Sequence, residues 1–156
     1  CALPVYYLTV QDALWINLRI TKKSSAFVHT KLEEAVFCQY SYGGTKSVVA
    51  QSANLLIGFE RIKPFESGNR VTAFVMLLAY LRVNGWKVNV GDDAAANWCT
   101  ELIASGEMAA SKLNSVAIED SEYHPTLEPN VRAAVEVVLA ESPKTVESFA
   151  RERVGA

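Results

Sequence analysis

A short polar turn stands directly ahead of one of the most apolar segments of the chain, and its residue types could bind phosphate. The turn contains Ser67, Gly68, Asn69 and Arg70, and Lys63 precedes it. The first N–H groups of a helix have no partner within the helix, and together with the helix dipole they attract anions. Gly68 would let an anion approach the backbone, Asn69 could cap the helix and brace the turn, and Arg70 would add a forked donor. The same residues also fit a tight turn with a cap and no ligand, so this stretch alone leaves both interpretations open.

A helix is predicted to follow this turn, from Gly68 to Asn84. Its apolar residues cover nearly the whole circumference, and Asn84-Gly85 ends it. A helix that is apolar on all sides must be surrounded by other elements. We therefore expect it to be the central, most buried element of the fold.

The rest of the chain is predicted to be mainly helical as well. Thr9 and Asp12 form a capping box ahead of a helix at 10–21, and a polar loop is expected from Glu119 to Pro129. Strand signals are scarce: the alternation at 86–90 is too short to build a sheet alone, and a small hairpin or flap could form around the glycines of 41–49. We predict one all-α domain spanning 1–156. Further helices are expected within 29–44, 45–62, 92–105 and 107–118, at 131–140, and beginning at 142–143.

Composition excludes several classes of protein. The 156 residues carry a net charge of −2, and Lys22-Lys23 is not part of a basic stripe, so nucleic acid is not an expected partner. Three widely spaced cysteines and two histidines do not form a zinc pattern, which favours Cys38 and Cys99 as buried free thiols in a reducing compartment. The longest apolar run, at 73–81, is too short to span a membrane. We expect a cytosolic protein without a membrane partner.

The segment KPFESGNRVTAF, at 63–74, resembles the signature of the Fic/Doc family, HPFxxGNxR, and especially HPFxDGNKRTA of the Doc (death-on-curing) branch. The resemblance extends over about 7–106 and includes YLRVNG after the motif, whereas 107–156 is expected to add C-terminal helices outside it. Six positions match the motif without a gap: Pro64, Phe65, Gly68, Asn69, Thr72 and Ala73.

The resemblance implies a compact helical bundle and a phosphate chemistry. In the family, the motif histidine is the general base on a target hydroxyl while part of a nucleotide is transferred. Fic members transfer a nucleotidyl group, whereas Doc members phosphorylate a translation factor and are restrained by an antitoxin. The resemblance assigns Phe65 to packing the turn onto the core and assigns Gly68 and Asn69 to the anion-binding corner.

This sequence departs from the family motif where the chemistry should be. Lys63 stands at the position of the histidine base, and a lysine of ordinary basicity is a cation at neutral pH, which favours a phosphate clamp over a base. A solvated lysine at a helix end is the other interpretation that this position leaves open. Ser67 replaces the acidic residue that holds magnesium, and the adjacent Glu66 is not assigned that role, so we expect no metal site. Val71 replaces the motif arginine, while Arg70 points about 100° away from it on a helix.

Two hypotheses follow, and we favour the first. The chain is a degenerate Fic/Doc-like protein that lacks the family's transfer reaction and keeps a cleft for an anion or a partner chain, such as an antitoxin-like protein or a target protein. The alternative is an active Doc-like kinase or Fic-like nucleotidyltransferase toxin with a rewired site. That enzyme would use Lys63 and Arg70 with ATP and magnesium as cofactors.

Overall fold

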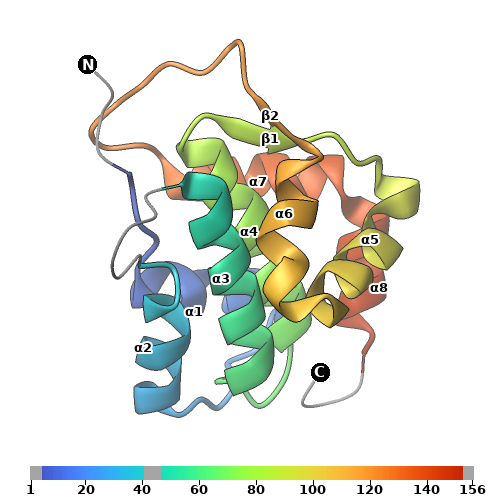
Figure 1. The fold of residues 1–156 in the computed structure, drawn as a ribbon. Helices are drawn as coiled ribbons and strands as arrows, with labels where there is room; N and C mark the ends of the chain where they lie inside the picture. The colour runs from blue at the N-terminus through green and yellow to red at the C-terminus, as the bar shows by residue number, and fades with distance from the viewer. Residues whose placement is uncertain (1–4, 41–46, 153–156) are drawn as a thin grey trace.

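A computed structural model describes residues 5–40 and 47–152, which fold into a helical bundle (Figure 1). The predicted all-α class is confirmed, because the described segments form helices apart from one very small sheet. In chain order the elements are α1 (Val10–Thr21), α2 (His29–Phe37), α3 (Val48–Ile62), α4 (Asn69–Val83), β1 (Trp86–Val88), α5 (Asp92–Ala104), the 3-10 turn η1 (Gly106–Met108), α6 (Ala109–Asn114), β2 (Ala117–Glu119), α7 (Val131–Glu141) and α8 (Pro143–Ala150).

Helix α4 is the centre of the bundle, as its composition predicts. It contacts α1, α3, α7 and α8, and Figure 1 shows it behind α3. Its buried side chains point in every direction, from Val71 in the first turn to Leu81 in the last. Burying apolar surface is the main favourable contribution to folding. The polar turn is therefore attached to a helix that tight packing holds in place.

The ends of the helices follow local capping signals. The capping box at Thr9 and Asp12 is present, and α1 has the predicted bounds. Helix α2 ends earlier than expected, at Phe37. Beyond it the backbone bonds reach three residues back, as from Gln39 N to Val36 O at 3.3 Å, so the α-helical pattern ends there. The buried side-chain amide of Gln39 accepts a hydrogen bond from Leu8 N at 2.8 Å and donates one to Leu8 O at 2.6 Å. These two bonds tie the N-terminal segment to the chain that leaves α2.

The small sheet joins two segments that are far apart in sequence. Strands β1 and β2 pair antiparallel, with Trp86 opposite Glu119 and Val88 opposite Ala117. The predicted hairpin around 41–49 falls largely outside the described residues, whereas the 86–90 alternation finds its partner strand at 117–119. Strand β2 was not predicted, because three residues carry too little pattern to identify a strand.

Candidate functional site

The polar turn links α3 to α4 through two residues with a left-handed backbone. Lys63 ends α3 with φ 49°, and Gly68 precedes α4 with φ 77°. Pro64 has no N–H to continue the hydrogen-bond ladder of α3, so the helix stops there. A Cβ atom at Gly68 would lie 2.7 Å from Thr21 Cγ2 and 3.1 Å from Asn17 Nδ2, so helix α1 closes this side of the turn.

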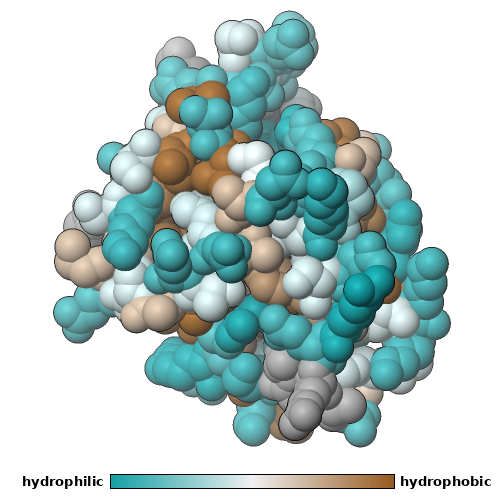
Figure 2. Space-filling view, turned by 90° about the vertical axis from the view of Figure 1, so that its right-hand side faces the viewer, coloured by the Kyte–Doolittle hydropathy of each residue, from teal (hydrophilic) through white to brown (hydrophobic). Residues whose placement is uncertain are grey.

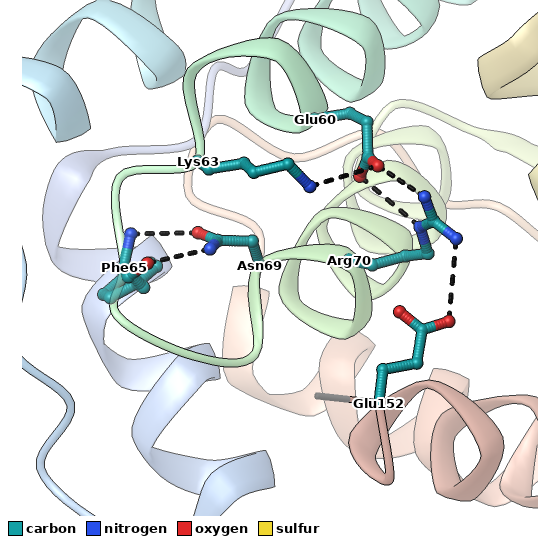
Figure 3. Close-up of polar contacts among 6 residues, drawn as sticks. All are labelled: Glu60, Lys63, Phe65, Asn69, Arg70 and Glu152. Carbon is teal, nitrogen blue, oxygen red and sulfur yellow. Dashed lines mark hydrogen bonds and ion pairs between the residues drawn. The ribbon is translucent and has the colours of Figure 1, made fainter. Parts of the chain in front are cut away.

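Asn69 holds the turn in shape from inside. Its side chain accepts a hydrogen bond from Phe65 N at 2.9 Å and donates one to Phe65 O at 2.8 Å, and Asn69 is completely buried (Figure 3). The Phe65 ring in turn packs against Phe59 and Phe27, with ring centroids 6.1 Å apart in both pairs. Asn69 therefore braces the turn, while Gly68 takes the N-cap position of α4 without a side-chain cap.

Lys63 and Arg70 both point toward Glu60 (Figure 3). Lys63 Nζ lies 3.4 Å from Glu60 Oε1, and Arg70 Nη2 lies 2.5 Å from the same oxygen. Arg70 Nη1 also lies 3.6 Å from a carboxylate oxygen of Glu152, just beyond α8. The side chain of Glu60 is only 13% exposed, whereas that of Lys63 is 41% exposed.

The ion pairs of this cluster shift the pKa values of Glu60 and Arg70. Burial opposes ionisation of Glu60, but hydrogen bonds and charges from Arg70 and Lys63 lower its pKa below the ordinary value. The hydrogen bond with Glu60 raises the pKa of Arg70, although partial burial opposes the rise. Two cations and two carboxylates therefore balance, and both cations are oriented by Glu60.

The turn is also held from the side by α1 and the segment after it. Asn17 Nδ2 donates to Ser67 O and to Thr72 Oγ1, both at 3.1 Å. Ser67 N donates to Ser25 Oγ at 3.3 Å, and the two serine hydroxyls lie 3.2 Å apart. The Ser67 hydroxyl thus has a protein partner.

Three backbone N–H groups at the start of α4 have no hydrogen-bond acceptor among the described residues. The first hydrogen bond of the helix runs from Thr72 N to Gly68 O at 3.0 Å. The N–H groups of Asn69, Arg70 and Val71 have no acceptor among the described residues. The predicted anion-binding residues Phe65, Ser67, Gly68, Asn69 and Arg70 therefore lie together around one helix start, although Arg70 is engaged by carboxylates.

Sequence reasoning missed four residues that shape this site: Asn17, Ser25, Glu60 and Glu152. Asn17 is a polar residue within an otherwise apolar helical stripe, which could have indicated a buried hydrogen bond. Glu60 lies one turn before Lys63 and carries a charge opposite to its neighbours, which could have indicated an ion pair. The contacts of Ser25 and Glu152 join segments distant in sequence, and their local sequence carries no signal for them.

No group of three or more His, Cys, Asp and Glu side chains within 5–40 and 47–152 is arranged to hold a metal ion. In the same segments, none of the helices combines the length and the apolar character needed to cross a bilayer. Comparisons with protein-family models, with curated proteins and with solved structures found no match.

Proposed function

We propose that this protein is a degenerate Fic/Doc-like binding protein, in which the turn at 63–70 receives an anionic group and no longer transfers phosphate or a nucleotide. The observation that carries the proposal is the shared orientation of Lys63 and Arg70 toward Glu60. The motif resemblance supplies the family, and the geometry of the turn supports loss of the reaction.

Lys63, at the position of the family base, is oriented as a cation that could hold a phosphate. A general base must offer a lone pair to the target hydroxyl. The Lys63 ammonium instead donates a hydrogen bond to Glu60, and its backbone φ of 49° fixes the direction in which the side chain leaves the turn.

Ser67 and Val71, at the positions of the metal ligand and the arginine of the motif, also support loss of the reaction. Ser67 offers a hydroxyl in place of a carboxylate, and that hydroxyl lies against Ser25. Val71, at the position of the family arginine, is completely buried in the core. A neutral hydroxyl is a poor ligand for magnesium, and a buried valine cannot contact a phosphate, so the charge that develops during transfer would lack both the metal and the arginine of the family motif.

What remains is a rigid set of donors. The N–H groups at the start of α4 have no acceptor among the described residues, and Lys63 could turn from Glu60 toward an anion bound there because its side chain is partly exposed. A phosphate or an acidic side chain of a partner, such as an antitoxin-like protein, fits these donors. The proposed role is therefore binding, with the partner supplying the anionic group.

Transfer of labelled phosphate tests the loss of reaction. Wild-type protein is incubated with magnesium and ATP, GTP, CTP or UTP labelled at the α or γ position, with and without cell extract. We expect no label on any protein. If wild-type protein transfers label and Lys63→Ala abolishes the transfer, the protein is the rewired enzyme and the proposal is wrong.

Calorimetry with ATP tests the binding site. We expect magnesium to change the dissociation constant less than about twofold, because no carboxylate stands at Ser67. Lys63→Met should weaken binding about two- to fivefold, while Lys112→Met on α6 should leave it unchanged. If magnesium tightens ATP binding tenfold, the expected absence of a metal site is wrong. If Lys63→Met binds ATP as tightly as wild type, Lys63 does not act as a phosphate clamp.

A further inference from the structure

A cavity of about 320 Å³ lies beside the second half of α4, away from the polar turn. It is enclosed by α4, β1, the start of α5 and the end of α7. The face that carries α5 and α8 is mostly hydrophilic, and its hydrophobic side chains gather toward the end where β1 lies (Figure 2). The proposed function does not use this cavity.

The cavity wall is mainly apolar and carries two indole rings, Trp86 from β1 and Trp98 from α5. Along β1, Trp86 and Val88 are partly buried and Lys87 is exposed. Because successive side chains of a strand point to opposite faces, the lysine side chain points away from the cavity. The apolar part of the wall is completed by Phe74, Leu78, Val90, Ala95 and Val138.

The charged groups of the wall already have partners within the protein. Glu141 pairs with Arg82, whose Nη2 lies 2.6 Å from Glu141 Oε1. The carboxylate of Asp92 accepts hydrogen bonds from two backbone N–H groups in the first turn of α8, at 2.8 and 3.0 Å. A charged ligand would therefore lose its hydration without gaining a free opposite charge from the described wall, which favours a neutral ligand.

The hydroxyl group of Ser142 is the polar group that the wall leaves available. Ser142 lines the cavity, is only 8% exposed and is the N-cap residue of α8. A serine at this position usually accepts a hydrogen bond from the first N–H groups of its helix. Its side chain makes no such bond here, because Asp92 binds those N–H groups instead. The Ser142 hydroxyl has no hydrogen-bond partner in the described part of the chain, and an unpaired buried hydroxyl is costly, so a ligand that pairs with it is favoured.

We propose that this cavity binds a neutral, planar molecule of two fused aromatic rings, with the rings beside Trp86 and Trp98 and one polar group hydrogen-bonded to Ser142 Oγ. The size supports two rings, because an apolar cavity of about 150 Å³ holds one benzene molecule. Large aromatic side chains favour a planar apolar ligand. A serine hydroxyl can both donate and accept, so a hydroxyl group of the ligand can pair with it in either direction.

The indole N–H signals in a proton–nitrogen correlation spectrum report binding directly. The probe is 2-naphthol, which is neutral at pH 7, added to the full chain. We expect the signals of Trp86 and Trp98 to shift and the signal of Trp15 to stay, because Trp15 lies on α1 with Arg132 4.9 Å from its ring centre. No shift up to millimolar 2-naphthol, or a shift of Trp15 alone, overturns the proposal.

The charge of the ligand is tested with 2-naphthoate, which has the same rings and a carboxylate in place of the hydroxyl. We expect it to bind at least about fivefold more weakly than 2-naphthol, because the wall offers its charge no free partner. Lys87→Met should leave the affinity for 2-naphthol unchanged, because the lysine lies on the other face of β1. Equal or tighter binding of 2-naphthoate overturns the assignment of a neutral ligand.

The hydrogen bond is tested with Ser142→Ala. We expect this variant to bind 2-naphthol about two- to tenfold more weakly, as for the loss of one hydrogen bond. It should bind 2-methylnaphthalene, which lacks the hydroxyl, as tightly as wild type does, and this comparison separates the hydrogen bond from a change in the shape of the cavity. Ser111→Ala, at an exposed position of α6, is the control and should change neither affinity. Equal binding of 2-naphthol by Ser142→Ala and wild type, or equal weakening for both probes, overturns the role of Ser142.

Filling the cavity tests its location. Val138 lines the cavity and is 2% exposed, whereas the adjacent Val137 is 38% exposed. We expect Val138→Phe to weaken 2-naphthol binding at least about tenfold and Val137→Phe to leave it within about twofold, because only the first change takes up space in the cavity. Circular dichroism checks that each variant is folded, and Leu78→Trp replaces Val138→Phe if that variant does not fold. Unchanged binding in a folded, filled variant overturns the proposal.

Discussion

Glu60 and Arg70 join the two helices on either side of the polar turn, with Arg70 Nη2 2.5 Å from Glu60 Oε1. Glu60 lies in the last turn of α3 and Arg70 in the first turn of α4, so their ion pair links the end of one helix to the start of the next. Lys63 and Glu152 complete the cluster. The same carboxylate thus holds the connection of the two central helices and orients both cations of the candidate site.

Replacing Glu60 by Gln should destabilise the protein by about 1–3 kcal/mol at pH 7, because the partly buried Arg70 loses its charged acceptor. The pKa of Glu60 is lowered in the folded state, so its contribution is fully present above the ordinary value of 4.5 and is lost as the pH falls through the folded value. Denaturant unfolding from pH 7 to pH 3 measures this.

The stability of Glu60→Gln should therefore fall less between pH 5 and pH 3 than that of wild type. The matched control is Glu136→Gln, which breaks the exposed pair with Arg19 and should cost less than about 1 kcal/mol. If the unfolding free energies of wild type and Glu60→Gln fall in parallel with pH, the loss of stability in acid does not come from the Glu60 carboxylate.

The features that could be predicted from sequence are those encoded within a few residues. The capping box at Thr9 and the apolar circumference after Gly68 determine α1 and α4 through contacts three and four residues apart. The hydrogen bonds of Asn69 to Phe65 also lie within four residues of each other. These parts of the fold and the site follow from local periodicity and turn chemistry.

The features that could not be predicted depend on the folded chain. Strand β2 exists because β1 is near it, and its three residues have no pattern of their own. Arg70 was expected to face a phosphate, yet Glu60 from one helix and Glu152 from the end of the chain meet it in the bundle. The direction of a long charged side chain is determined by its tertiary neighbours, which sequence spacing does not contain.

Gly68→Ala should destabilise the protein by two separable effects. The left-handed backbone at φ 77° costs about 1–2 kcal/mol for a residue with a Cβ, and the clash with Thr21 Cγ2 adds roughly 1–3 kcal/mol. Gly106→Ala is the matched control, because Gly106 has φ 54° and no atom within 4 Å of an added Cβ. Thermal and denaturant unfolding of both variants should show the larger loss for Gly68→Ala.

A second substitution isolates the crowding at Gly68. Thr21→Ser removes the clashing methyl group and keeps the hydroxyl that donates to Asn17 O. We expect Gly68→Ala to cost less in the Thr21→Ser background than in wild type. If the stability losses of Gly68→Ala and Thr21→Ser simply add in the double variant, the methyl group of Thr21 does not crowd position 68.

Asp92→Ala should loosen the C-terminal helix. The carboxylate of Asp92 accepts from Thr145 Oγ1 at 2.8 Å as well as from the first N–H groups of α8, so it caps that helix from α5. Loss of a cap costs about 0.5–2 kcal/mol. Asp93→Ala is the control: its side chain is 86% exposed and its only recorded partner is the Lys144 ammonium. Hydrogen exchange should show faster exchange in α8 for Asp92→Ala alone, and equal exchange in both variants would contradict the capping role.

Asn69→Ala should be among the most destabilising changes at the turn. The substitution leaves Phe65 N and Phe65 O without their side-chain partner inside the protein, and each unpaired buried group costs about 1–3 kcal/mol. Asn97→Ala, on the exposed side of α5, should change stability by less than about 0.5 kcal/mol. Denaturant unfolding at pH 7 compares the two, and similar small losses would contradict the bracing role.

Asn69→Asp distinguishes the hydrogen bonds from simple packing, because it keeps the shape of the side chain and removes the amide donor. At pH 7 the introduced carboxylate would be buried and would face Phe65 O, so we expect a loss at least as large as that of Asn69→Ala. Protonation would restore a donor, and burial raises the pKa of such a carboxyl group. The difference in unfolding free energy from wild type should therefore shrink between pH 7 and pH 5. A difference that does not change with pH would show that Asn69 acts through its volume and not through its bond to Phe65 O.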